Sequence, residues 1–145
     1  MRYMLPILLT FMLAVTSVLI ADEGETPALS VVEIVVAAGF DREARTPTDV
    51  AESFPADTDR LWCYTRVTGA QQPLEIVHTW YHEGETRARV GLPVRSSDWR
   101  TWSRKDILPG WTGQWVVKVL DPDGLVLATR SFTIASPPEV VEEVE

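Results

Sequence analysis

Residues 60–68 read RLWCYTRVT, and along them the side chains alternate between two characters. Leu61 and Cys63 fall on one side of an extended chain, whereas Trp62 and Arg66 fall on the other. A period of two residues is typical of a β-strand with one buried face. The stretch therefore predicts a strand that packs its first side into a hydrophobic core.

Six other stretches have the same alternating or β-branched character. They cover residues 30–38, 74–83, 86–92, 99–104, 114–120 and 125–134. Turn signals such as Gly69–Pro73, His82–Glu85 and Asp121–Gly124 separate them at intervals of roughly ten residues. This pattern predicts an all-β protein, an immunoglobulin-like Greek-key β-sandwich of about seven strands, with a small closed barrel as the alternative.

The two ends of the chain differ from its middle. Residues 1–21 combine a basic start with an apolar run and end in a small residue, which predicts a signal peptide or a membrane anchor helix. We expect residues 22–29 to be a linker, 30–135 the β-sandwich domain and 136–145 an acidic disordered tail. The domain is then periplasmic or otherwise extracytoplasmic, and it stays anchored in the inner membrane if the first segment is not cleaved.

The net charge of −8 is concentrated at the two ends of the chain. Seven of the 21 acidic residues lie in residues 22–25 and 136–145, so the domain between them is close to neutral. No nucleic-acid partner is expected, and membrane contact is expected only through an uncleaved N-terminal segment. The single cysteine, Cys63, excludes an intrachain disulfide and is expected to be a small buried hydrophobe.

Two histidines, His78 and His82, raise the question of a metal site. Four residues along a strand span roughly 13 Å, whereas nitrogens that share one zinc each lie about 2 Å from it. We therefore expect neither a metal nor a cofactor. Both histidines share a strand face with Trp80, and two interpretations stay open: side chains hydrogen-bonded at the ends of the core, or a pH-sensitive polar patch.

Catalytic motifs are missing from the sequence. No two carboxylates are placed at one site by their spacing, and no serine stands in a nucleophile elbow. No glycine-rich loop could hold a phosphate either. These observations favour a protein that is not an enzyme.

The segment from Arg87 to Lys105 is strongly basic and rich in tryptophan. It holds six of the 13 Lys and Arg residues, with Asp98 as its only acid. Strand alternation places Trp102 on one face and Trp99 on the other, so one indole points outwards. The candidate ligand-binding residues are Arg95, Trp99, Arg100, Trp102, Arg104 and Lys105.

Five motifs stand out between residues 53 and 134. They are SFPAD at 53–57, LWCYTRV at 61–67, HTWYHEG at 78–84, LPVRSSDWRTWS at 92–103 and WTGQW at 111–115. Together they resemble a bacterial family called domain of unknown function 2914. The resemblance implies an exported or envelope domain with a sandwich-like fold, and it attaches no reaction to that domain.

Exposed indoles beside arginines suit planar or anionic ligands, because guanidinium groups hold carboxylates and phosphates in a fork. We expect a non-catalytic binding or accessory domain of the bacterial cell envelope that contacts an anionic glycan or polymer. One alternative is a structural protein–protein interaction module in the envelope. Another is that both tryptophans belong to the core and the arginines form a solvated surface over them.

Overall fold

Within residues 24–142, which the computed structural model describes, the chain forms nine β-strands and no helix. The strands are β1 (Ser30–Asp41), β2 (Thr46–Val50), β3 (Ser53–Phe54), β4 (Arg60–Thr68), β5 (Leu74–His82), β6 (Glu85–Val94), β7 (Asp98–Asp106), β8 (Gly113–Leu120) and β9 (Val126–Ile134).

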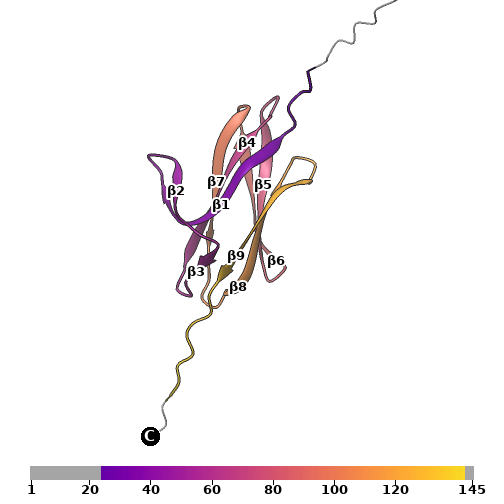
Figure 1. Ribbon diagram of the computed structural model, residues 1–145. Coiled ribbons are helices and arrows are strands. Elements are labelled where there is room, and N and C mark those ends of the chain that lie inside the picture. Colours follow the sequence, from indigo (N-terminus) through magenta and orange to yellow (C-terminus); the bar gives the residue numbers. More distant parts are fainter. Residues whose placement is uncertain (1–23, 143–145) are drawn as a thin grey trace, which may run out of the picture.

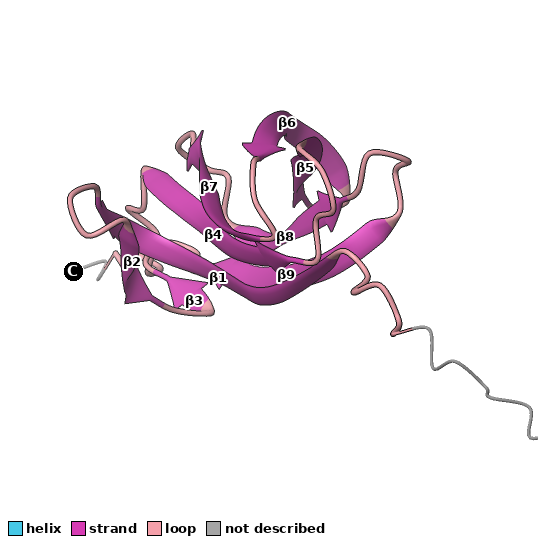
Figure 2. Ribbon diagram, turned by 90° about the horizontal axis from the view of Figure 1, so that it is seen from above, coloured by secondary structure: helices cyan, strands magenta, loops and turns pink. Residues whose placement is uncertain are grey.

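The strands form two sheets that face each other (Figures 1 and 2). One sheet has the order β2-β1-β4-β7, and the other has the order β3-β9-β8-β5-β6. Neighbouring strands are antiparallel, except that β3 runs parallel to β9. The chain crosses between the sheets after β2, β3, β4, β6 and β7 and forms hairpins within one sheet at β1–β2, β5–β6 and β8–β9. This connectivity is that of an immunoglobulin-like sandwich, which confirms the predicted fold class.

The structure has two more strands than the seven predicted, because β2 and β3 carry no sequence signal of their own. β2 contains Pro47, and β3 consists of two residues only. Proline is tolerated in β2 because this strand lies at the edge of its sheet, where one backbone donor can be missing. β3 pairs with β9 where Phe54 enters the core. Contact with a neighbouring strand, and not a local pattern, therefore defines both segments.

Alternate residues of both sheets fill the space between them. Leu61 and Cys63 of β4 and Trp80 of β5 are fully buried, which confirms the alternation predicted for these strands. On β8, Trp115 is also fully buried, and its ring stacks on that of Phe132 with 5.9 Å between centroids. Aromatic side chains of this size bury the largest apolar areas, so they supply much of the hydrophobic contact between the sheets.

Two hairpins use the turns that the sequence predicted. Between β5 and β6, Glu83 and Gly84 both have a positive φ, of 48° and 79°, as a two-residue type I′ turn requires. Between β8 and β9, the Asp121 carboxylate accepts a hydrogen bond of 2.9 Å from the backbone N–H of Asp123, and Gly124 has a φ of 87°. Turn geometry of this kind sets the register of the strands on either side.

Cys63 is fully buried in β4, as predicted. Burial raises the pKa of its thiol to about 12, so almost no thiolate forms near neutral pH. We expect the native protein to resist a chromogenic disulfide reagent at mildly alkaline pH, and to react fully once denaturant unfolds it. Rapid labelling of a protein whose circular dichroism spectrum is unchanged would contradict this prediction.

The segments that flank the sandwich have no regular secondary structure at residues 24–29 and 135–142. Figure 1 shows that they leave the sandwich at opposite ends. In the described part of the chain, no helix has the length and apolar character needed to cross a bilayer. The predicted signal peptide or anchor at residues 1–21 lies outside the described residues.

Candidate ligand-binding site

β7 divides the predicted binding residues between two faces, as the alternation indicated. Thr101 and Ser103 are buried, and Ser103 faces the opposite sheet. Arg100, Trp102 and Arg104 alternate with them and therefore lie on the outer face of the sheet. The strand thus separates these three side chains from the candidates that lie on its inner face.

Lys105 lies on the inner face of β7, next to the Trp111 ring. Its Nζ is 5.2 Å from the centroid of the Trp111 ring, and the guanidinium carbon of Arg87 is 4.7 Å from the same ring. Two cations therefore cover one indole between the edge strands β6 and β7. This contact separates Lys105 from the arginines of the outer face.

The hairpin between β1 and β2 covers part of the outer face of β7. Phe40 packs on Trp102 with 4.4 Å between ring centroids, and the guanidinium carbon of Arg45 lies 5.4 Å from the centroid of the same indole. In the turn, the Asp41 carboxylate accepts a hydrogen bond of 2.9 Å from the backbone N–H of Ala44. Of the two tryptophans, one of which was predicted to point outwards, it is Trp102 that does so, but it supports the hairpin and is not a free stacking surface.

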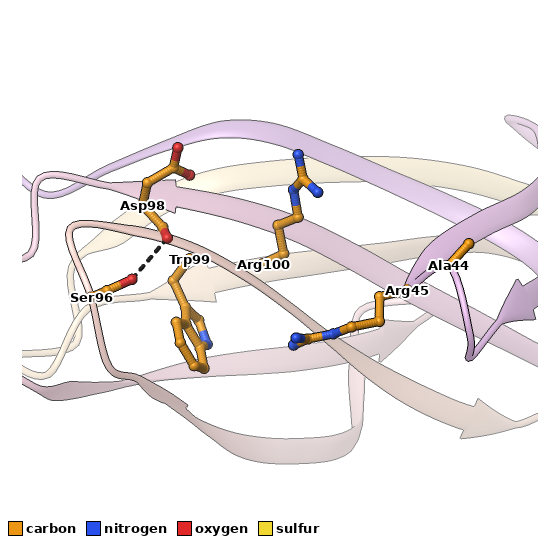
Figure 3. A pocket seen from close by; sticks show the side chains of 6 residues that line it. All are labelled: Ala44, Arg45, Ser96, Asp98, Trp99 and Arg100. Atoms are coloured by element: carbon orange, nitrogen blue, oxygen red, sulfur yellow. Dashed lines mark hydrogen bonds between the residues drawn. The ribbon is translucent and has the colours of Figure 1, made fainter.

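A cleft of about 370 Å³ lies between this hairpin and the start of β7 (Figure 3). Its lining residues are Ala44, Arg45, Ser96, Asp98, Trp99 and Arg100. In Figure 3, Asp98 and Arg100 point to one side of β7 and Trp99 points to the other. Because β7 is an edge strand, some of its backbone N–H and C=O groups also face away from β4. The cleft therefore combines an indole, two guanidinium groups and a carboxylate.

The charges in this cleft do not cancel. Asp98 is paired with Arg66 of β4 through two hydrogen bonds of 2.8 and 2.6 Å, and this pairing holds the pKa of the Asp98 carboxyl below its usual value. Within residues 24–142, neither Arg45 nor Arg100 has a carboxylate oxygen within 4.0 Å. Two guanidinium groups in the cleft are therefore available to an anionic ligand.

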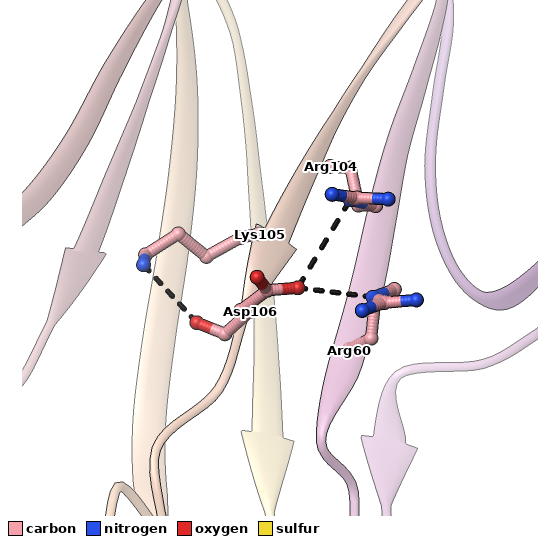
Figure 4. A network of polar contacts seen from close by, with 4 residues as sticks. All are labelled: Arg60, Arg104, Lys105 and Asp106. Carbon is pink, nitrogen blue, oxygen red and sulfur yellow. Dashed lines mark hydrogen bonds and ion pairs between the residues drawn. The ribbon is translucent and has the colours of Figure 1, made fainter.

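Two other candidates, Arg104 and Arg95, lie outside the cleft. Arg104 Nε is 4.0 Å from Asp106 Oδ1, and Arg60 Nε is 2.9 Å from the same oxygen (Figure 4). The hydrogen bond from Arg60 keeps the pKa of the Asp106 carboxyl low, so this end of the outer face is closer to neutral. Arg95 is exposed in the loop between β6 and β7.

His78 is completely buried in a hydrogen-bond network that joins the two sheets. Its Nδ1 lies 2.7 Å from Ser103 Oγ, and its Nε2 lies 3.2 Å from Thr65 Oγ1. The Thr65 hydroxyl donates to the backbone oxygen of Thr101 at 3.3 Å. The indole N–H of Trp80 donates to Ser103 Oγ at 3.0 Å.

Burial and these contacts together determine the state of His78. Burial lowers the pKa of the imidazole to about 4, so the ring is neutral near pH 7. Because the Thr65 hydroxyl donates to a carbonyl oxygen, the tautomer that fits the contacts carries its hydrogen on Nε2 and donates it to Thr65. Its Nδ1 then accepts the hydroxyl hydrogen of Ser103.

His82 lies at the end of the same strand in different surroundings. It is 7% exposed, its Nε2 donates to the backbone oxygen of Thr112 at 2.7 Å, and its ring stacks on Trp115 at 4.7 Å. His78 and His82 therefore have separate partners inside the sandwich and do not form a solvent-facing patch. No group of three His, Cys, Asp or Glu residues that could hold a metal ion occurs in the described part of the chain.

The fold and the cleft define the class of this protein: an immunoglobulin-like β-sandwich domain with a cationic cleft at one edge strand. A crystal structure of an immunoglobulin-like protein from Pseudomonas aeruginosa shares the fold, with a TM-score of 0.50 and 13% sequence identity over 77% of this chain and 100% of that chain. Residues 73–134, which contain β5 to β9, match the family described as "Protein of unknown function (DUF2914)". This match confirms the resemblance over residues 73–134, whereas the motifs at 53–57 and 61–67 lie before it. No curated protein matches the chain.

Sequence reasoning missed Arg45, which lines the cleft, and Arg66, which pairs with Asp98. Arg45 stands in the β1–β2 turn with a φ of 55°, and nothing in the sequence signals a left-handed conformation at an arginine. Arg66 was predicted to lie on the outer face of its strand, but its pairing with Asp98 depends on the register between β4 and β7. A prediction of which strands are neighbours could have found the second residue.

Proposed function

We propose that this domain is a non-catalytic binding module of the bacterial cell envelope that holds an acidic polymer at the cleft and along the adjoining outer face of β7. One observation carries the proposal: Arg45 and Arg100 line a cleft together with a half-buried indole, and among the described residues no carboxylate pairs with either. Hydrogen bonds from a guanidinium group to an anion are roughly twice as strong as neutral ones. Farther along the outer face, Arg60 and Arg104 share the carboxylate of Asp106, so one positive charge remains there for a further repeat unit of a polymer.

The acid in the cleft supports binding better than catalysis. Asp98 is paired with Arg66, and its pKa is lowered by that hydrogen bond. A general acid or base works best when its pKa lies near the working pH. The lowered pKa of the Asp98 carboxyl is therefore unsuited to that role near neutral pH. As a permanently ionised group, Asp98 acts instead as a hydrogen-bond acceptor for a ligand.

The envelope location is a part of the proposal that rests on the sequence. A basic start and an apolar run precede the sandwich in residues 1–21, in the order of a secretory signal. Outside the cytoplasm, acidic polysaccharides and wall polymers are the abundant polyanions. A cationic cleft on an exported domain would therefore meet a ligand of suitable charge.

Retention on immobilised polygalacturonate, heparin and wall teichoic acid tests the proposal at low and at physiological salt. We expect retention on at least one polymer that weakens with salt. The Arg100→Ala variant should bind about tenfold more weakly, which corresponds to a loss of about 1.4 kcal/mol. Arg89→Ala is the matched control, because Arg89 is exposed on β6 in the other sheet.

Two outcomes would contradict this function. Unchanged retention of the Arg100→Ala variant would show that the polymer binds elsewhere. Retention on none of the polymers would exclude an acidic polymer as the ligand. In that case, recovery of an envelope protein by crosslinking in cells would support the alternative, a structural interaction module.

A further inference from the structure

We propose that the cleft between the β1–β2 hairpin and β7 holds one acidic sugar residue of the uronic acid type. The sugar would lie across the exposed edge of β7, with its carboxylate on Arg45 and Arg100 and a hydroxyl group on Asp98. Its ring would reach Trp99, which points to the other side of the strand. This inference rests on the proposed function, because it names the repeat unit that the polymer must contain.

The positive charge of the cleft comes from two separate elements of the fold. Arg45 reaches the cleft from the β1–β2 turn, and Arg100 reaches it from β7 (Figure 3). The contacts of Phe40 and Arg45 with the Trp102 ring hold the turn against the strand. Guanidinium groups present their donors in a plane that matches the two oxygens of a carboxylate.

Asp98 distinguishes a sugar from a simple anion. Its two carboxylate oxygens accept hydrogen bonds from Arg66, and an ionised carboxylate can accept about four in all. The remaining capacity would repel a phosphate group and would accept a hydroxyl hydrogen. The occupant must therefore carry hydroxyl donors beside its acid group, as a uronic acid does.

Trp99 supplies the apolar wall. It is half-buried, it packs against the core cluster that contains Val67 and Val94, and it also lines the cleft. A ring fixed in this way can receive the C–H face of a sugar at low entropic cost. The volume of about 370 Å³ lies at the small end of ligand sites, which suits a single ring better than a long segment of polymer.

Titration of the protein with trigalacturonate, followed by tryptophan fluorescence and calorimetry, tests the assignment. We expect binding of trigalacturonate, at least tenfold weaker binding of its methyl ester, and no competition from inorganic phosphate at the same concentration. Arg45→Gln should weaken the binding of trigalacturonate about tenfold, and Asp98→Asn should weaken this binding severalfold. Arg42→Gln should bind like the unchanged protein, because Arg42 is exposed in the same turn and does not line the cleft.

Each outcome separates this inference from the proposed function. If an acidic polymer is retained but Arg45→Gln binds it as well as Arg42→Gln does, the cleft is not the site, while the binding function stands. If the methyl ester binds equally, or phosphate competes equally, the acidic sugar is excluded. If no acidic polymer is retained at all, both proposals fail together. A thermal midpoint unchanged from that of the parent protein shows that each variant is folded.

Discussion

Lowering the pH from 7 to 4.5 is expected to reduce the free energy of unfolding by about 2 to 3 kcal/mol through His78 alone. The folded protein holds this imidazole neutral, because burial lowers its pKa to about 4. In the unfolded chain the same group titrates near its ordinary pKa of about 6.5. Between the two values the unfolded state binds a proton and the folded state does not. This contribution is therefore fully present above pH 6.5 and is lost as the pH falls towards 4.

Urea unfolding at a series of pH values from about 4.5 to 7.5 measures this effect. His78→Gln is the comparison variant, because glutamine keeps a donor and an acceptor but does not titrate. Its stability should vary much less over this range, even if it is lower throughout. Asp98 and Asp106 do not obscure the result, because their lowered pKa values place their titration below the range. Parallel pH profiles of the two proteins would contradict the role assigned to His78.

The Ser103→Ala variant is expected to lose about 2 to 4 kcal/mol of stability. The Ser103 hydroxyl bonds both His78 Nδ1 and Trp80 Nε1, and both partner residues are 0% exposed. Its removal leaves one buried acceptor and one buried donor without a partner. Each such group costs roughly 1 to 3 kcal/mol, because water cannot replace the lost hydrogen bond.

Ser131→Ala serves as the control for this prediction. Ser131 is exposed on β9, and substitutions at such positions usually change stability by less than about 0.5 kcal/mol. Thermal and urea unfolding of both variants would give the difference directly. A loss below about 1 kcal/mol in Ser103→Ala would mean that the network tolerates a missing member, and the tautomer deduced for His78 would then lose its support.

The sequence predicted those parts of the site that depend on strand alternation. A strand turns successive side chains to opposite faces whatever its neighbours are, so the opposite faces of Trp99 and Trp102 followed from local spacing. The shared face of His78, Trp80 and His82 followed in the same way. Of the six candidate binding residues, Trp99 and Arg100 line the cleft. Lys105 does not, because the inner face of β7 directs it towards Trp111. Alternation alone could not reveal that this part of the inner face is covered.

The remaining cleft residues came from contacts between segments distant in the sequence. Arg45 is brought to β7 by a turn whose stability depends on the packing of Phe40 against Trp102. β2 and β3 exist only as partners of β1 and β9. Long-range contacts of this kind leave no periodic signal in a single chain, because neither partner changes the local pattern of the other.

The sequence by itself determined the fold class and the faces of the main strands, because both follow from a period of two residues and from turn chemistry. Tertiary structure alone decided which charges meet. The register of β4 against β7 neutralises Asp98 with Arg66, whereas Arg45 and Arg100 keep their charges free of a nearby carboxylate within residues 24–142. The reason is that an ion pair requires its two groups to lie within about 4 Å, and only the folded chain sets that distance.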